Sequence, residues 1–135
     1  MFKALLLNRN ADKSTTATLT ELDDSALPPG DVTVRVAWST LNYKDALAVT
    51  GRGAIVKTWP MVAGIDLAGT VEASSHPDWQ AGDAVVVNSW GLGETHWGGL
   101  AQKARVSADW LLKVPAPYSL RDTMAIGTAG YTGAL

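Results

Sequence analysis

The stretch GIDLAGTVEA, residues 64–73, alternates in side-chain character with a period of two residues. That period is typical of a β-strand with one buried face. One face of this predicted strand, the buried one, consists of Ile65, Leu67, Gly69 and Val71. The other face consists of Asp66, Ala68, Thr70 and Glu72. A glycine within such a pattern predicts a bulge or the close approach of another backbone, so we expect one of these at Gly69.

Other short strands are predicted on both sides of this one. Residues 31–38, DVTVRVAW, alternate strictly after the turn signal LPPGD, and their predicted buried face consists of Val32, Val34, Val36 and Trp38. Residues 82–90, GDAVVVNSW, contain a continuous apolar run, which is typical of a strand covered on both faces. The remaining predicted strands lie within residues 3–8, 16–22, 98–107 and 110–115. Short strands separated by Gly, Pro and Asp turns predict a β-barrel or a strongly bent sheet.

The composition fits one globular domain and excludes several classes of function. The chain has 135 residues, of which 47% are hydrophobic and 18% charged, so it can bury a core. Its net charge of −2 gives no basic surface for nucleic acid or an anionic membrane. No apolar run is long enough to span a bilayer, and no signal peptide is evident. The absence of cysteine excludes disulfides and thiolate zinc sites, and it agrees with a cytoplasmic protein.

A polar cluster follows the strand at residues 31–38. In TLNYKDALAVTGRG, residues 40–53, an amide, a phenol, an amine and a carboxylate are consecutive. Such a group can donate or accept protons, or hold a polar ligand. Two structural alternatives compete with a functional role. Asn42 and Asp45 could cap a short helix, and Tyr43 could be a packing residue whose hydroxyl has a structural partner.

The C-terminal residues change from strand to helix patterns. Ser119 and Asp122 have the spacing of a capping box, and a second helix is expected to begin near Thr128. That second helix would have barely two turns, and helices of this length are marginal without a packing partner. We therefore expect residues 121–135 to be the start of a segment that continues elsewhere.

Several separated motifs together resemble one superfamily. GIDLAGTV followed by AGDAV, within residues 64–85, is similar to the G-H-E-x-x-G-x-V … G-D-x-V signature of the medium-chain dehydrogenase/reductases. STLNYKDALAVTG, SWGLGETHWGGLAQKARV, DWLLKVP and IGTAGYTGAL narrow the resemblance to the acryloyl-CoA reductase branch, which has also been described as quinone oxidoreductases. The motifs extend over essentially the whole chain, and GETHWGGLAQKARV is the most specific of them.

The resemblance implies a fold and a domain organisation. It predicts a mainly β structure with short helices, in which residues 1–120 form a GroES-like, partly open β-barrel that serves as the catalytic domain. Residues 121–135 would begin the linker helix into a Rossmann domain that is absent from this chain. No G-x-G-x-x-G turn follows a strand, so we expect most of the dinucleotide site to lie outside this chain.

The resemblance also implies an activity. The expected reaction is NADPH-dependent reduction of acryloyl-CoA to propionyl-CoA by hydride transfer to the β-carbon, with the isolated chain inactive. An acyl-CoA substrate, no nucleic-acid or membrane partner, and a homodimer of the full-length protein are expected. Two alternatives stay open: an NADPH-dependent quinone or enone oxidoreductase, and a non-catalytic GroES-like binding module.

The implied site uses the polar cluster and one residue of the C-terminal helix. Tyr43, Asn42 and Asp45 are the predicted catalytic residues, and Tyr43 and Thr128 are predicted to contact the cofactor. Whether Tyr43 donates a proton or only contacts the cofactor is open, and Thr128 could equally be an N-cap. No zinc is expected, because Ile65 and Asn42 stand where zinc enzymes have a histidine and a cysteine.

Other polar residues carry weaker expectations. His76 and His96 have poor spacing for a metal site with Glu72 or Glu94. Isolated cations can contact CoA phosphates, and the candidates in this sequence are Arg35, Arg52 and Lys57.

Overall fold

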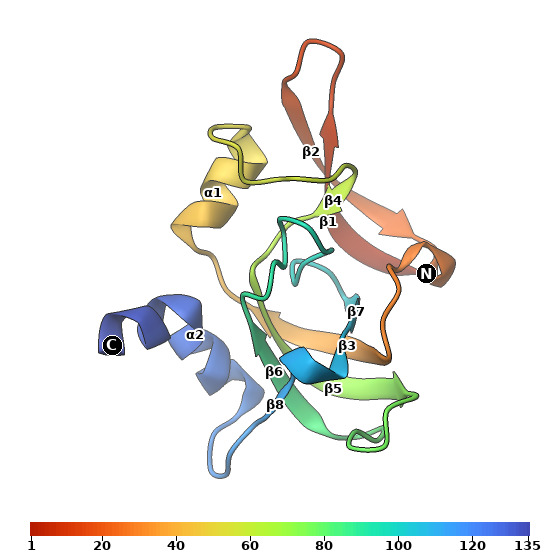
Figure 1. Cartoon of the computed structure of the whole chain (residues 1–135), viewed down its shortest axis with the longest axis vertical. Coiled ribbons are helices and arrows are strands. Elements are labelled where there is room, and N and C mark those ends of the chain that lie inside the picture. The colour runs from red at the N-terminus through yellow and green to blue at the C-terminus, as the bar shows by residue number, and fades with distance from the viewer.

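Eight strands form two antiparallel sheets in the computed structural model, which describes residues 1–135. The three-stranded sheet has the order β2-β1-β4, with bounds Thr15–Leu22, Phe2–Arg9 and Met61–Val62. The five-stranded sheet has the order β7-β3-β5-β6-β8, with bounds Lys103–Val106, Val32–Ser39, Asp66–Ser74, Ala84–Asn88 and Leu112–Lys113. The helical elements are η1 (Asp24–Ala26), α1 (Tyr43–Thr50), η2 (Ala108–Trp110) and α2 (Leu120–Ala134). Both α-helices lie on the same side of the strands (Figure 1).

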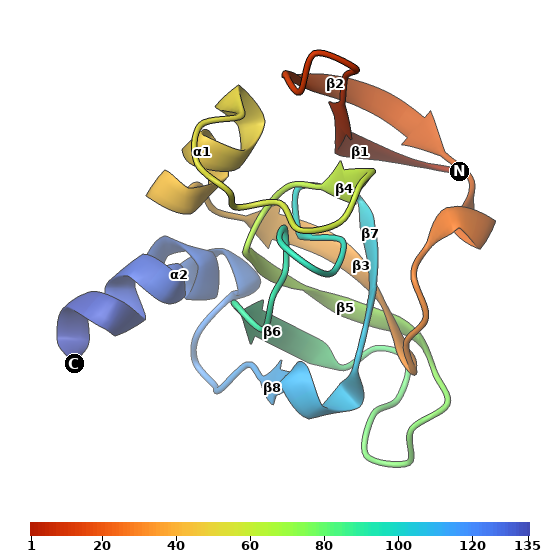
Figure 2. The ribbon, with the colours of Figure 1, turned by 45° about the horizontal axis from the view of Figure 1, so that its top comes forward.

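Residues 100–102 join the two sheets. The amide of Leu5 in β1 donates to the carbonyl of Leu100 at 2.9 Å, and the amide of Gln102 donates to the carbonyl of Lys3 at 2.9 Å. On the other side, the amide of Val36 in β3 donates to the carbonyl of Gln102 at 2.9 Å. The two sheets are therefore continuous through this segment and form a partly open barrel, as the sequence predicts (Figure 2).

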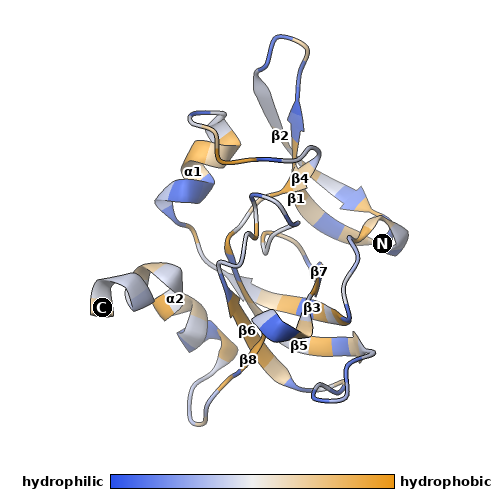
Figure 3. Ribbon diagram, in the orientation of Figure 1, coloured by the Kyte–Doolittle hydropathy of each residue, from blue (hydrophilic) through white to orange (hydrophobic).

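The main core fills the space inside the five-stranded sheet. Its buried members come from four of the five strands, the loop after β6, and η2 with its C-cap: Val32, Val34, Leu67, Val71, Val85, Val87, Leu92, Ala104, Val106, Ala108 and Leu111. Figure 3 shows these strands as largely hydrophobic, in contrast to the hydrophilic tip of the β1–β2 hairpin. The alternation predicted for β3 and β5 is confirmed on this face.

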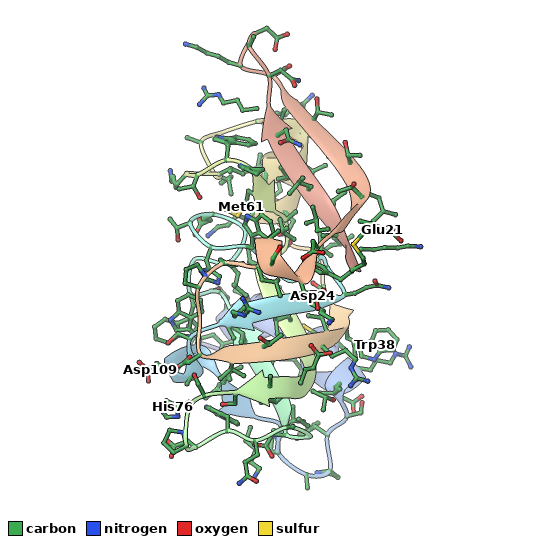
Figure 4. The ribbon with its side chains drawn as sticks, turned by 90° about the vertical axis from the view of Figure 1, so that its right-hand side faces the viewer. Glu21, Asp24, Trp38, Met61, His76 and Asp109 are labelled. Atoms are coloured by element: carbon green, nitrogen blue, oxygen red, sulfur yellow. The ribbon has the colours of Figure 1, made fainter.

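The predicted irregularity at Gly69 is confirmed as a close backbone approach opposite a bulge. A Cβ atom at Gly69 would collide with the carbonyl oxygen of Arg35 in β3. The register of β3 against β5 also shifts between Val36 and Trp38. This shift turns Trp38 outward, so the prediction that Trp38 is buried is wrong. The indole is 47% exposed and lies beneath the guanidinium of Arg121, 5.7 Å from the ring centroid (Figure 4).

Helix α2 covers the second face of β5 and β6. Met124 packs with Ala68 and Val86, and this contact buries all three side chains. β6 is therefore covered on both faces, as predicted. β5 differs from the prediction of one exposed face, because Asp66 and Ala68 are both 0% exposed beneath α2.

Both helices begin at the predicted capping residues. Asn42 and Asp45 form a capping box at the start of α1, and Ser119 and Asp122 form one at the start of α2. Gly127, with φ 53° and ψ −166°, interrupts α2, so its second segment starts at Thr128, where the sequence predicts a second helix. Neither helix combines the length and the apolar character needed to cross a membrane.

Gly69→Ala should lower the free energy of unfolding by about 2 kcal/mol, because the added methyl group would meet rigid backbone rather than a movable side chain. Gly133→Ala in α2 is the matched control, since nothing lies within 4 Å of a Cβ at that position. Urea denaturation monitored by tryptophan fluorescence measures both changes. Equal stability of the two variants would contradict the close approach.

Candidate active site

The carboxylate of Asp66 connects both helices to the sheet. Asp66 is the first residue of β5, and its Oδ2 accepts from Asn42 Nδ2 at 3.1 Å and from the amide of Thr128 at 3.0 Å. The hydroxyl of Thr128 donates to the other oxygen, Oδ1. Hydrogen bonds to an ionised acceptor are stronger than those between neutral groups. One fully buried carboxylate therefore holds the first residues of α1 and the second segment of α2 together.

The kink at Gly127 makes the contact with Thr128 possible. A Cβ atom at Gly127 would lie 3.0 Å from Thr40 Cγ2 and 3.1 Å from Asp66 Oδ2, so a side chain would crowd the carboxylate. Because the helix restarts after the kink, the free amide of Thr128 points at Asp66. A negative charge at the start of a helical segment is favourable.

Asp45 supplies a second buried carboxylate, 3% exposed. Its Oδ2 accepts from the amide of Asn42 at 2.8 Å. Burial raises the pKa of the Asp45 carboxyl above its usual value; the Asn42 hydrogen bonds lower it, and the charge of Asp66 adds to the increase. Asn42 thus lies between two carboxylates, with its backbone bound to one and its side chain to the other.

The loop after β6 closes the other side of this cluster. Ser89 Oγ lies 3.1 Å from Thr128 Oγ1, within hydrogen-bonding distance. Ser89, Trp90 and Gly91 all have positive φ angles, of 68°, 56° and 82°, which is a strained conformation for the first two. Asn88 pairs with Asp66 across the sheet, and its Oδ1 is the one buried side-chain polar atom without a hydrogen-bond partner. A buried acceptor left unpaired costs free energy unless a further group completes it.

Tyr43 stands beside the cluster and points away from the protein. It is the first residue of α1, its side chain is 80% exposed, and its hydroxyl makes no hydrogen bond within the chain. Lys44 next to it forms an ion pair with Glu94 at 3.2 Å, which links α1 to the loop at residues 91–98. The phenol is therefore free to contact a ligand. The alternative that its hydroxyl hydrogen-bonds to another residue of the barrel is wrong.

The structure brings together most of the predicted site residues. Asn42 and Thr128 both contact Asp66, Asp45 contacts Asn42, and Tyr43 is adjacent but exposed. The capping alternative for Asn42 and Asp45 is also confirmed, because the capping box is present. Their part in a reaction stays a prediction.

Sequence reasoning missed Asp66, Asn88 and Ser89. The alternation of residues 64–73 places Asp66 on the face opposite Leu67 and Val71, and α2 packs against that face. The available signal is a carboxylate at the first position of β5, followed by the apolar residues Leu67 and Ala68.

The two histidines have structural contacts outside this cluster. His96 lies with Nε2 2.6 Å from the carbonyl oxygen of Arg105, and its ring packs edge-on against Trp110 at 4.9 Å. His76 accepts from the amide of Asp78 in an exposed turn (Figure 4). No group of three or more His, Asp or Glu side chains is arranged to hold a metal ion.

Comparison with known proteins finds one domain family and several related enzymes. Residues 28–116 match the family described as the alcohol dehydrogenase GroES-like domain. The chain is 54% identical over 133 residues to a probable acrylyl-CoA reductase, AcuI, of Escherichia coli (strain K12). It is 47% identical over 136 residues to the acrylyl-CoA reductase AcuI of Ruegeria pomeroyi. These matches cover 98% and 100% of this chain, but 41% of the length of each relative.

Solved structures confirm the fold. The yhdH oxidoreductase from Salmonella enterica, crystallised with NADP, is 55% identical with a TM-score of 0.93; the match covers 96% of this chain and 40% of that one. The Bacillus subtilis protein yhfP, crystallised with NAD, is 41% identical with a TM-score of 0.93, covering 98% of this chain and 40% of that one. Its curated name assigns YhfP provisionally to the quinone oxidoreductases.

Asp66→Asn should destabilise the protein by about 3 kcal/mol, because an uncharged amide replaces the acceptor of three hydrogen bonds and adds an N–H facing donors. Denaturation measures the loss, and hydrogen exchange should show faster opening of residues 128–134. Asp109→Asn, at an exposed residue, is the matched control. Unchanged exchange in residues 128–134 would contradict the role of Asp66.

The raised pKa of Asp45 predicts a pH dependence of stability. Between the ordinary value of 3.8 and the higher folded-state pKa, the folded protein holds more protons than the unfolded one. This contribution to stability is therefore present below about pH 3.8 and is lost as the pH rises through the folded pKa. The free energy of unfolding of the wild type minus that of Asp45→Asn should fall as the pH rises.

Asp122→Asn provides a control of opposite sign. Hydrogen bonds from Ser119 lower the pKa of Asp122, so its stabilising contribution should grow as the pH rises from acid towards neutrality. Urea titrations between about pH 2 and about pH 7 measure both differences, since the change for Asp122 falls at and below its ordinary pKa of 3.8. A difference for Asp45 that rises with pH would contradict the predicted shift.

Proposed function

This chain belongs to the alcohol dehydrogenase GroES-like domain family, and on that premise we propose that it is the catalytic-domain part of an NADPH-dependent reductase that converts acryloyl-CoA to propionyl-CoA. The observation that carries the proposal is the similarity over at least 98% of the chain to two proteins named as acrylyl-CoA reductases. The chain spans about two fifths of their length. The activity is therefore assigned to the full-length protein.

The reaction adds a hydride to the β-carbon of the alkene and a proton to the α-carbon. Negative charge builds on the thioester oxygen during the first step, so the site needs hydrogen-bond donors there. NADPH, when bound, supplies the hydride. The residues of this chain supply orientation, hydrogen bonds and a route for the proton.

The residues near Asp66 fit a nicotinamide and an acyl group. The phenol of Tyr43 is exposed and unpartnered, so its hydroxyl can donate a hydrogen bond to a ligand. The orphaned Oδ1 of Asn88 is an acceptor suited to an N–H of a carboxamide. Tyr43 and Thr128 are the residues of this chain that we expect to hold the cofactor.

Asn42 is a hydrogen-bond donor whose position is fixed by contacts with two carboxylates. An amide nitrogen carries two N–H groups, and Asp66 uses one of them. The second can donate to a thioester oxygen. Asp45 fixes the backbone of Asn42, so we assign to Asp45 the task of orienting this donor.

The name of YhfP favours a second candidate, a reductase of quinones or simple enones. The same hydride chemistry suits any electron-poor alkene, so the polar cluster alone does not separate the two. Competition between acryloyl-CoA and a simple quinone in one assay separates them. The homodimer and the cytoplasmic location expected for the full-length protein stay predictions.

Tyr43→Phe should lower kcat/KM for acryloyl-CoA about 100-fold in the full-length protein, measured as NADPH oxidation, because the variant lacks the exposed hydroxyl of Tyr43. A fall in kcat would indicate a proton donor, and a rise in KM for NADPH alone would indicate a cofactor contact. Tyr118→Phe, also exposed, is the control and should change neither constant.

Three outcomes of this assay contradict parts of the proposal. Full activity of Tyr43→Phe would remove Tyr43 from the catalytic residues. Turnover of quinones without turnover of acryloyl-CoA would favour the second candidate. No NADPH oxidation with either acceptor would reject both reductase functions.

A further inference from the structure

A second cavity lies at the opposite end of α1 from Asn42. It occupies about 320 Å³ between the tip of the β1–β2 hairpin and the loop that follows α1. Two cations line it from the hairpin, Arg9 and Lys13, together with the hydroxyl-bearing Thr15. Gly51, Gly53 and Trp59 line it from the other side. We call this cavity the hairpin pocket.

The two cations of the hairpin pocket have no acidic partner. Neither Arg9 nor Lys13 forms a salt bridge with any carboxylate of the chain. The acid nearest in sequence, Asp12, is bound instead to Ser14, accepting from its amide at 2.9 Å and its hydroxyl at 2.5 Å. Two unpaired positive charges in one concave site favour an anionic ligand.

The hairpin is held in shape without a ligand. Asn10 Nδ2 donates to Ser14 Oγ at 2.9 Å and to Thr16 Oγ1 at 2.8 Å. Lys13 takes a left-handed conformation, with φ 68°, that non-glycine residues adopt at some cost. The turn that presents Lys13 is therefore fixed by side-chain hydrogen bonds, and this preorganisation lowers the cost of binding.

Two glycines after α1 let the floor of the pocket pack closely against the hairpin. Gly51 and Gly53 have φ angles of 71° and 77°, and a Cβ at Gly51 would lie 2.7 Å from Thr15 Oγ1. The carbonyls of Leu47 and Ala48 at the end of α1 already accept from the amides of Arg52 and Gly51. The backbone at this end of α1 is therefore fixed by its own hydrogen bonds.

Two further cations flank the pocket. Arg52 lies between the two glycines, and Lys57 Nζ donates to the carbonyl of Ala54, a lining residue, at 2.5 Å. Both were candidates from the sequence for contacts with CoA phosphates. Arg35, the third candidate, lines a different cavity with Glu72 and Lys103.

From this geometry we propose that the hairpin pocket binds the phosphate groups of the acyl-CoA substrate. The identity of the ligand rests on the proposed function. α1 has eight residues, so the pocket lies about 12 Å along the helix from Asn42. A thioester at Asn42 would reach the pocket by laying its extended arm along α1, which lies beside the hairpin in Figures 1 and 2.

The test compares two thioesters in the full-length protein. Acryloyl-CoA carries the phosphates, and acryloyl-pantetheine carries the same reacting group without them. In the double variant Arg9→Gln/Lys13→Gln, KM for acryloyl-CoA should rise about tenfold. For acryloyl-pantetheine, both kcat and KM of this variant should stay within about twofold of the wild-type values. Added salt should raise KM for acryloyl-CoA in the wild type more than in the variant.

A control variant removes the same charge elsewhere. Lys3→Gln/Lys113→Gln changes two cations outside the hairpin pocket and should leave both KM values unchanged. An unchanged KM for acryloyl-CoA in Arg9→Gln/Lys13→Gln would overturn the proposal, and so would an equal rise for both thioesters. A rise in KM for NADPH alone would assign the pocket to a cofactor phosphate and would also overturn it.

Calorimetry separates this proposal from the proposed function. If the wild type does not reduce acryloyl-CoA, the reductase function fails, but binding of coenzyme A still tests the pocket. Coenzyme A binding that is lost in Arg9→Gln/Lys13→Gln and kept in the control supports the pocket. Equal binding by all three proteins, or no binding by the wild type, rejects it. Inorganic phosphate bound as tightly as coenzyme A would indicate a general anion site and overturn the acyl-CoA assignment.

Discussion

The burial of one charge, the carboxylate of Asp66, determines how the two helices sit against the barrel. A buried carboxylate without partners would cost several kcal/mol, so its donors must stay in place whenever the protein is folded. Those donors belong to the N-cap of α1 and to the residue after the kink of α2. The barrel is held by apolar contacts among its strands, whereas the site beside it is held by this polar contact.

Helix α1 links the two regions to which we assign ligand chemistry. Its first residues lie between two buried carboxylates, and its last residue precedes the glycine that lines the hairpin pocket. A short helix is rigid over its length, so the distance between the regions is set by the number of residues in α1. The ion pair between Lys44 and Glu94 attaches the first turn of α1 to the loop at residues 91–98 as well.

The sequence predicted the local features of the fold and missed those that depend on distant contacts. The alternation of β3 and β5 and both capping boxes are predicted because neighbouring residues determine them. The close approach at Gly69 is predicted because a glycine in an alternating strand is itself a signal of it. Trp38 was placed on the wrong face because a bulge shifts the register after Val36. The burial of Asp66 depends on Thr128, 62 residues away, and the hairpin pocket depends on the contact of two turns. No local pattern encodes either of them.

The kink at Gly127 and the carboxylate of Asp66 also depend on each other in the folded protein. A side chain at position 127 would press on the carboxylate, and loss of the carboxylate would leave the Thr128 amide without its acceptor. The dependence is not symmetric, because φ 53° with ψ −166° is a conformation that glycine adopts far more readily than other residues, whatever stands at position 66. The backbone of the kink thus restricts position 127 first, and the contact with Asp66 adds to that restriction.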